Sequence, residues 1–271
     1  MAIKQIGYCL ITISLLCLAG CAQKKEAALN DPEPVWSDEF DYTGLPDSTR
    51  WGYDTGGDGW GNNEKQFYTE KRAQNAHVEN GILTITAIKE DFQGAGYTSA
   101  RLVSKNKGDW KYGRMEIKAK LPRGRGIWPA IWMLPTDWKY GDWPESGEID
   151  IMEFVGYLPD SVFATVHTGA YNHSIGTQKG TQTFRTDLSE TFHVYTLDWN
   201  ENEIKIFIDD EAYFTYNNEK KTFREWPFDQ KFHLLLNVAV GGNWGGKMGI
   251  DDTIFPQTMQ VDYVRVYQGK H

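Results

Sequence analysis

Apolar and polar residues alternate along several segments of this chain, and this two-residue period constrains its fold more than any other feature. The alternation or β-branched character runs through residues 82–87, 114–120, 203–208 and 260–267, and turn-forming residues bound these segments. Successive side chains of a strand point to opposite faces of a sheet, so this pattern predicts strands. No window of a dozen residues shows helical spacing of apolar residues. We therefore expect an all-β, antiparallel sandwich or barrel.

The composition indicates a folded protein with a sizeable core. Hydrophobic residues make up 40% of the chain and charged residues 24%. No internal repeat, low-complexity tract or flexible linker follows residue 35, so residues 35–271 are expected to form one domain. The net charge of -9 argues against a nucleic-acid partner. The 11 Trp, 14 Tyr and 13 Phe favour a β-rich fold, and some of these rings are candidates for ligand binding.

All three cysteines lie near the N-terminus, at Cys9, Cys17 and Cys21, which excludes thiol chemistry from the rest of the chain. Residues 1–20 carry one charge and a short apolar run, as a signal peptide does. Residues 18–21, Leu-Ala-Gly-Cys, resemble the lipobox of bacterial lipoproteins. This resemblance implies lipidation of Cys21, a flexible tether over 21–34 and anchoring to a bacterial membrane, at the outer membrane or cell surface. An ordinary secretory signal is the alternative.

Three carboxylates are concentrated in one expected strand, within residues 147–155. In a regular strand Glu148 and Asp150 share one face and Glu153 points to the other. A β-bulge at Ile151-Met152 would bring all three to one surface. Two acids about 5 to 5.5 Å apart perform retaining glycoside hydrolysis, one as nucleophile and the other as acid and then base. From spacing alone, a half-buried strand with acids on its solvated face is the simpler interpretation.

The three acids cannot all be comfortably ionised, because neighbouring negative charge raises the pKa of the least solvated carboxyl group. We therefore expect Glu153 to stay protonated as the proton donor and Glu148 to be ionised as the nucleophile. Asp150 lies between them and would orient Glu148 through a hydrogen bond.

Tryptophans next to the acidic strand favour a sugar-binding cleft. Trp128 and Trp132 are an even number of residues apart and so share one face of a strand, while Trp143 leads into the acidic segment. Sugar rings present apolar C–H faces that pack on indole, and their hydroxyl groups need polar partners around the rim. The polar and glycine-rich flanks of these tryptophans favour a cleft over a core position.

The acidic segment 148–153, Glu-Ile-Asp-Ile-Met-Glu, resembles the signature of family 16 glycoside hydrolases, in the form with an extra residue typical of laminarinase-like members. The resemblance covers nearly the whole body, in the family's order, through residues 36–40, 59–64, 128–135, 164–167, 241–246 and 261–267. It implies a concanavalin A-like β-jelly-roll of two curved antiparallel sheets, with a substrate cleft on the concave face. It also implies a retaining endo-β-1,3(4)-glucanase.

The resemblance further implies roles for individual residues. Glu148 would be the nucleophile, Asp150 the assisting carboxylate and Glu153 the acid/base, with His167 as an active-site histidine near Glu153. The substrate-binding residues of the glycone side would be Asn63, Arg101, Trp128, Trp132 and Trp143.

A structural calcium ion on the convex face is also implied by the resemblance. Its expected ligands are Glu39, the carbonyl of Gly81 and Asp262, since Ca²⁺ prefers oxygen ligands. An ordinary surface acid and a turn glycine are the alternative. Catalysis itself needs no cofactor.

Three functions remain open from the sequence. The first is hydrolysis of laminarin-type β-1,3-glucan, extending to mixed-linkage β-1,3/1,4-glucan, by a monomeric enzyme. The second is a non-catalytic surface glycan-binding protein on the same fold, and the third is a glucan transglycosylase. Sulfated galactans fit poorly, because fixed carboxylates in the cleft repel sulfate.

Overall fold

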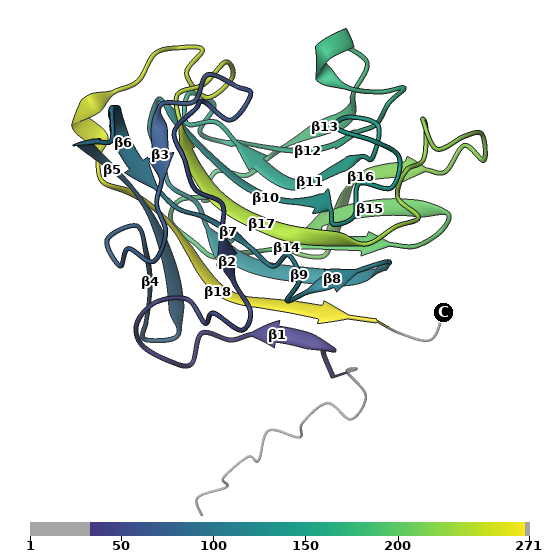
Figure 1. The fold of residues 1–271 in the computed structure, drawn as a ribbon, viewed down its shortest axis with the longest axis horizontal. Coiled ribbons are helices and arrows are strands. Elements are labelled where there is room, and N and C mark those ends of the chain that lie inside the picture. The colour runs from purple at the N-terminus through teal and green to yellow at the C-terminus, as the bar shows by residue number, and fades with distance from the viewer. Residues whose placement is uncertain (1–32, 269–271) are drawn as a thin grey trace, which may run out of the picture. The chain divides into compact units, whose positions relative to one another are not determined.

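Two curved β-sheets lie face to face in the computed structural model, which describes residues 33–268 (Figure 1). The larger sheet has the order β16-β15-β14-β9-β18-β5-β6-β3, with β1 beside β18 and β4 beside β5. Its strands are β1 (Trp36–Asp38), β3 (Gln66–Tyr68), β4 (Ala76–Glu79), β5 (Ile82–Phe92), β6 (Ala95–Ser99), β9 (Gly113–Lys120), β14 (His193–Trp199), β15 (Glu203–Ile208), β16 (Glu211–Asn217) and β18 (Gln257–Tyr267).

The smaller sheet has the order β13-β12-β11-β10-β17-β7-β2, with β8 beside β17. Its strands are β2 (Gly52–Tyr53), β7 (Arg101–Val103), β8 (Asp109–Trp110), β10 (Ile127–Pro135), β11 (Glu148–Phe154), β12 (Ser161–His167), β13 (Lys179–Phe184) and β17 (Phe232–Val240). The helices in the described residues are two 3₁₀ turns, η1 (His173–Ile175) and η2 (Asp252–Ile254). All strand pairs are antiparallel except β3 with β6, so the predicted all-β sandwich is confirmed.

The core lies between the two sheets and follows the alternation of the sequence. In β9, Met115, Ile117 and Ala119 are fully buried while the residues between them are half-buried on the opposite face. The strands predicted over 82–87, 114–120, 203–208 and 260–267 correspond to β5, β9, β15 and β18. Burying one face of each strand removes apolar surface from water at about 25 cal/mol per Å², which is the main term that stabilises such a sandwich.

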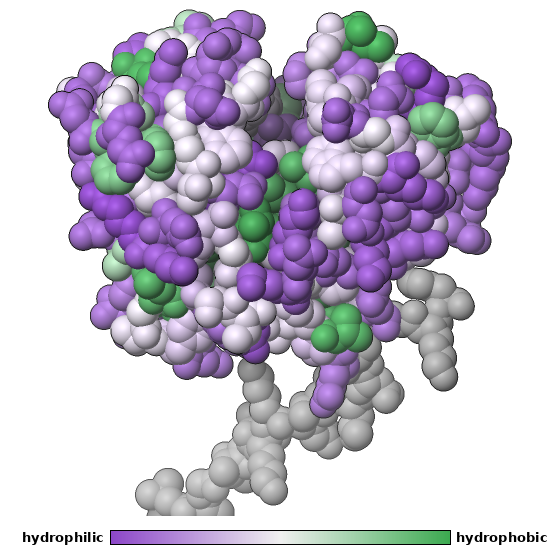
Figure 2. All heavy atoms as spheres, in the orientation of Figure 1, coloured by the Kyte–Doolittle hydropathy of each residue, from purple (hydrophilic) through white to green (hydrophobic). Residues whose placement is uncertain are grey.

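Strand β17 departs from this pattern, because all nine of its residues are buried. Leu234 and Leu236 belong to the core between the sheets, whereas Asn237 and Ala239 line a cleft on the other face. The smaller sheet therefore has two covered faces at its centre. Figure 2 shows the surface hollowed between two lobes on this side of the molecule.

The expected signal peptide (1–20), the lipidated Cys21 and nearly all of the tether (21–34) lie outside the described residues. From Glu33 onward the chain forms one compact unit. No helix within residues 33–268 is long and apolar enough to cross a membrane.

Candidate active site

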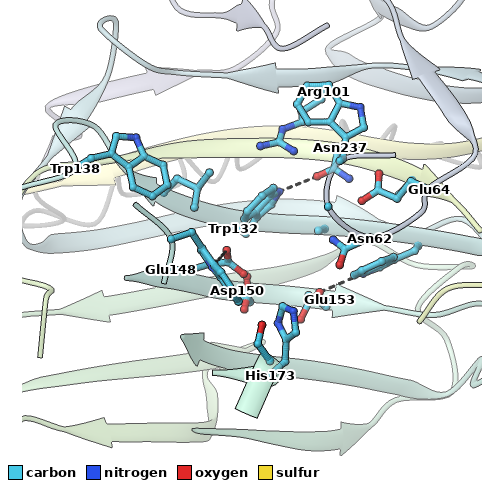
Figure 3. Close-up of a pocket in the computed structure, with 18 residues that line it drawn as sticks. Asn62, Glu64, Arg101, Trp132, Trp138, Glu148, Asp150, Glu153, His173 and Asn237 are labelled. Atoms are coloured by element: carbon cyan, nitrogen blue, oxygen red, sulfur yellow. Dashed lines mark hydrogen bonds between the residues drawn. The ribbon is translucent and has the colours of Figure 1, made fainter. Parts of the chain in front are cut away.

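A β-bulge in β11 brings the three acidic side chains to one face. Between Asp150 and Glu153 this strand advances three residues while its neighbour β12 advances two. Ile151 and Met152 are consecutive and both fully buried in the core, so the bulge adds one core residue to β11 that has no partner in β12. Glu148, Asp150 and Glu153 then line the same cleft (Figure 3). The predicted bulge is confirmed at the predicted position.

The cleft has a volume of about 420 Å³ and is lined mainly by aromatic and polar side chains. Its floor comes from β11, β10 and β17, and its walls come from loops and from β7. The predicted residues Arg101, Trp128, Trp132 and Trp143 all line it. The other side chains of the lining include Trp60, Asn62, Glu64, Ala130, Leu134, Trp138, His173, Ser174, Asn237 and Ala239.

Two tryptophans hold the two glutamates. The indole Nε1 of Trp143 donates a hydrogen bond to Oε2 of Glu148 over 2.9 Å, and that of Trp128 donates to Oε1 of Glu153 over 3.1 Å. Each indole fixes one oxygen of a carboxyl group. These tryptophans therefore orient the acids as well as lining the cleft.

His167 ends β12 directly opposite Glu148 in the strand register. Its Nε2 lies 3.7 Å from Oε1 of Glu148 and 3.4 Å from Oδ2 of Asp150. The register sets it against Glu148 and Asp150, and its electrostatic effect lowers the pKa of Glu153 as well, so it also lies near Glu153 as the resemblance implies. Its second ring nitrogen, Nδ1, is buried without a hydrogen-bond partner.

Burial raises the pKa of all three carboxyl groups. The pKa of Glu148 rises to about 8, through desolvation first and repulsion from Asp150 second. That of Glu153 rises to about 7, again mainly through desolvation, and that of Asp150 rises well above its usual value. We expected Glu153 alone to be protonated. The structure differs because both glutamates are buried in the same cleft and each has one indole donor.

Arg101 forms part of the wall, between two aromatic rings. Its guanidinium carbon lies 4.6 Å from the ring centroid of Trp60 and 4.7 Å from that of Trp132. Its Nε pairs with Oδ2 of Asp54 at 3.1 Å. Such cation–π contacts stabilise by roughly 0.5 to 2 kcal/mol and fix the planes of both rings.

A chain of buried hydrogen bonds supports Trp132 from behind. Its Nε1 donates to Oδ1 of Asn237 over 2.7 Å, and Nδ2 of Asn237 donates to the hydroxyl of Tyr68 over 2.9 Å. That hydroxyl donates to Oε2 of Glu64 over 3.3 Å. Desolvation raises the pKa of Glu64, which ends the chain at the cleft wall. The network fixes one orientation of the indole ring.

Asn62, and not the predicted Asn63, lines the cleft. Asn63 is exposed, and its Nδ2 donates to Oδ1 of Asn243 over 2.8 Å, whereas Asn62 lines the cleft. The backbone of this turn determines which of the two asparagines faces the cleft, since φ is 51° at Trp60 and 57° at Asn63. Left-handed residues in this turn reverse the direction of the side chains that follow.

Other cleft residues were not predicted: Trp60, Asn62, Glu64, Trp138, His173 and Asn237. The first three stand within the segment 59–64 that carried the family resemblance. Asn237 is the only polar residue between Leu234 and Val240, which was a usable signal. Trp138 and His173 lie outside the strands and have no period to reveal them.

The expected calcium ligands are engaged by basic side chains. Both carboxylate oxygens of Glu39 accept from Arg265, at 2.9 and 2.6 Å, and Asp262 pairs with Lys118 at 2.7 Å. Gly81 lies in the turn between β4 and β5 with φ of 77°. In this arrangement both carboxylates are paired with basic side chains, so a Ca²⁺ ion would have to displace Arg265 and Lys118.

Comparison with known proteins agrees with this geometry. The family model for glycosyl hydrolases family 16 matches residues 63–265. A beta-glucanase from Rhodothermus marinus is 56% identical over 247 residues, which is 87% of this chain and 85% of that protein. A glucan endo-1,3-beta-glucosidase from Cryptopygus antarcticus is 39% identical over 92% of this chain and 96% of that protein. The structure of the laminarinase from Rhodothermus marinus has a TM-score of 0.86 and 54% identity, over 88% of this chain and 98% of that one. The chain therefore belongs to glycosyl hydrolase family 16.

Proposed function

We propose that this chain is a retaining endo-β-1,3-glucanase that also cleaves mixed-linkage β-1,3/1,4-glucan. The bulge in β11 carries the proposal, because it places Glu148 and Glu153 on one face of an aromatic cleft. The names of the two relatives and of the similar solved structure support this substrate class. Two carboxyl groups suffice for the chemistry, so no cofactor is required.

In the first step Glu148 attacks the anomeric carbon of the sugar beside it. The bond from that carbon to the glycosidic oxygen breaks as the bond to Glu148 forms, and Glu153 gives its proton to the leaving oxygen. Asp150 and His167 lie within 3.4 Å of each other beside Glu148 and hold its orientation. The raised pKa of Glu153 keeps its proton available near neutral pH, whereas Glu148, whose pKa is raised to about 8, attacks only in the molecules in which it has lost its proton.

In the second step water resolves the glycosyl-enzyme. Glu153, now ionised, takes a proton from a water molecule, whose oxygen attacks the anomeric carbon and releases Glu148. Two displacements at one carbon restore its starting configuration. Trp128 keeps the carboxyl of Glu153 in place through both steps by its hydrogen bond.

The experiment is Glu148→Gln, assayed on laminarin, mixed-linkage glucan and agarose. We expect wild type to release reducing ends from the two glucans, and the variant to release none while still binding them. A wild type that binds glucan without releasing reducing ends would show a glycan-binding protein instead. Products longer than the oligosaccharide supplied would show a transglycosylase.

For the N-terminus, we propose a removed signal over 1–20, a lipid on Cys21 and a tether to about residue 34, followed by the catalytic domain. This arrangement would hold a monomeric enzyme at a bacterial outer membrane or cell surface. The support is the sequence Leu-Ala-Gly-Cys at 18–21. Cys21→Ser is expected to move the protein from the membrane fraction to the soluble fraction, and an unchanged distribution would contradict the anchor.

A structural Ca²⁺ at Glu39, Gly81 and Asp262 also remains a proposal. Its support is that strand pairing of β1 with β18, and of β18 with β5, brings these positions together. Binding would require Arg265 and Lys118 to release the two carboxylates. The ion would act on stability and not on the reaction.

A further inference from the structure

Two carboxyl groups that line the cleft and the buried imidazole beside them have the chemistry and spacing of a transition-metal site. We propose that Glu148, Asp150 and His167 bind one Zn²⁺ ion, and that the bound ion reversibly blocks the glucanase reaction. The inhibition rests on the proposed function, whereas the binding of the metal does not.

The distances between the ligand atoms fit the ion. His167 Nε2 lies 3.7 Å from Oε1 of Glu148 and 3.4 Å from Oδ2 of Asp150. One ligand atom from each of the three residues lies within 4.8 Å of the others. Zinc holds nitrogen and oxygen ligands at about 2.1 Å in a tetrahedron, whose edges are then about 3.4 Å. An ion between the three atoms therefore needs only small movements of the side chains.

One ligand atom of the proposed site has no hydrogen-bond partner to give up. Oδ2 of Asp150 is buried without a hydrogen-bond donor, and the side chain of Asp150 is only 3% exposed. A buried carboxylate oxygen without a donor is costly unless a proton or cation satisfies it. This oxygen is also the closer of the two carboxylate contacts of His167, so it points into the proposed site.

Charge and ligand type select the ion. Two adjacent buried carboxyl groups repel each other once they are ionised, and a divalent cation that replaces their protons offsets that repulsion. The imidazole nitrogen favours zinc, or copper and nickel, over Ca²⁺ and Mg²⁺, which take oxygen ligands. Three protein ligands leave the fourth position of a tetrahedral ion open toward the cleft. Glu153 is not in the set and stays free.

A bound ion would stop the reaction at its first step. Oε1 of Glu148 would donate its lone pair to zinc, so this oxygen could not attack the anomeric carbon. The ion would also stand where the sugar ring must approach Glu148. Zinc and glucan should therefore exclude each other, and a chelator should restore activity.

The test is calorimetric titration of the full chain with ZnCl₂ near neutral pH, without glucan, beside titrations with CaCl₂ and MgCl₂. We expect one Zn²⁺ per chain and no binding of the other two ions at this site. His167→Gln and Asp150→Ala should each weaken zinc binding by at least roughly tenfold. Absence of binding, or unchanged affinity in His167→Gln, would overturn the proposal.

Two histidine variants serve as matched controls. His77→Gln changes a histidine of β4 in the other sheet, and His173→Gln changes one whose ring centroid lies 5.1 Å from that of His167. Both should bind zinc as wild type does. A loss in His173→Gln equal to that in His167→Gln would show that the ligand set is wrong.

Kinetics then test the inhibition separately. Zinc should inhibit laminarin hydrolysis competitively, EDTA should reverse it, and His77→Gln should be inhibited like wild type. Zinc that binds with full stoichiometry but leaves hydrolysis unchanged would overturn the inhibitory role. A chain that binds zinc but cleaves no glucan would overturn the proposed function and leave the metal site standing.

Discussion

Replacing Glu153 by Gln should stabilise the protein at alkaline pH, although it removes the proposed proton donor. The pKa of Glu153 is raised from 4.5 to about 7, with desolvation as the largest cause and repulsion from Glu148 as a further one. Gln has nearly the same shape and can accept the same hydrogen bond from Trp128, but it cannot ionise. The variant therefore isolates the cost of placing a charge in this cleft.

The sign and size follow from proton linkage. The unfolded chain loses the proton of this residue near pH 4.5, while the folded chain keeps it to about pH 7. In the wild type, the contribution of protonated Glu153 to the free energy of unfolding is fully present below pH 4.5 and is lost as the pH rises through 7. Raising the pKa from 4.5 to about 7, at 1.36 kcal/mol for each pKa unit, lowers the free energy of unfolding of the wild type at alkaline pH by about 3 kcal/mol.

Thermal unfolding by calorimetry at about pH 4 and about pH 8 measures the effect. A domain of this size changes its Tm by roughly 2 to 4 °C per kcal/mol, so the Tm of the variant relative to wild type should rise by roughly 6 to 12 °C between the two pH values. Glu201→Gln, which changes an exposed glutamate, should show no such rise. A Tm difference for Glu153→Gln that is the same at both pH values would show that ionising Glu153 does not destabilise the folded protein.

Three further predictions concern activity and metal content. The rate of laminarin hydrolysis should depend on pH as a bell set by both raised carboxyl pKa values, about 8 for Glu148 and about 7 for Glu153, because Glu148 must be ionised while Glu153 holds its proton; a flat profile from about pH 4 to about pH 9 would exclude two essential carboxyl groups. Asn237→Ala removes the acceptor for Trp132 and should raise KM for laminari-oligosaccharides by roughly tenfold at most, with kcat little changed; an unchanged KM would show that the network does not position the ring. If Ca²⁺ displaces the ion pairs at Glu39 and Asp262, EGTA should lower the Tm, and equal Tm values with calcium and with EGTA would contradict the calcium proposal.

Residues in the alternating strands were predictable, because the two-residue period of the sequence matches the alternation of side chains between the two faces of a strand. Trp128 and Trp132 share the cleft face of β10 as their even spacing requires. The bulge in β11 was predictable for a different reason, since three acids in one strand make chemical sense only on one surface. Strand β17 gave no such signal, because it is covered on both faces and so has no alternation.

The loops account for the remaining differences. Asn62 and Asn63 are adjacent in sequence, and the left-handed backbone of their turn decides which one lines the cleft. His173 reaches the site from η1, where its ring packs 4.8 Å from that of Trp143. No spacing rule connects these two positions. The order of the carboxyl pKa values depends on burial in three dimensions, which the linear sequence does not contain.

The central claim is that hydrolysis passes through a glycosyl group covalently bound to Glu148. It is tested most directly by incubating the protein with a laminari-oligosaccharide that carries fluorine at C2 and a good leaving group, which slows the second step. Digestion and mass spectrometry then identify the modified residue. We expect one glycosyl group per chain, on Glu148. A label on Glu153, on another residue, or on none while the substrate is consumed would contradict it.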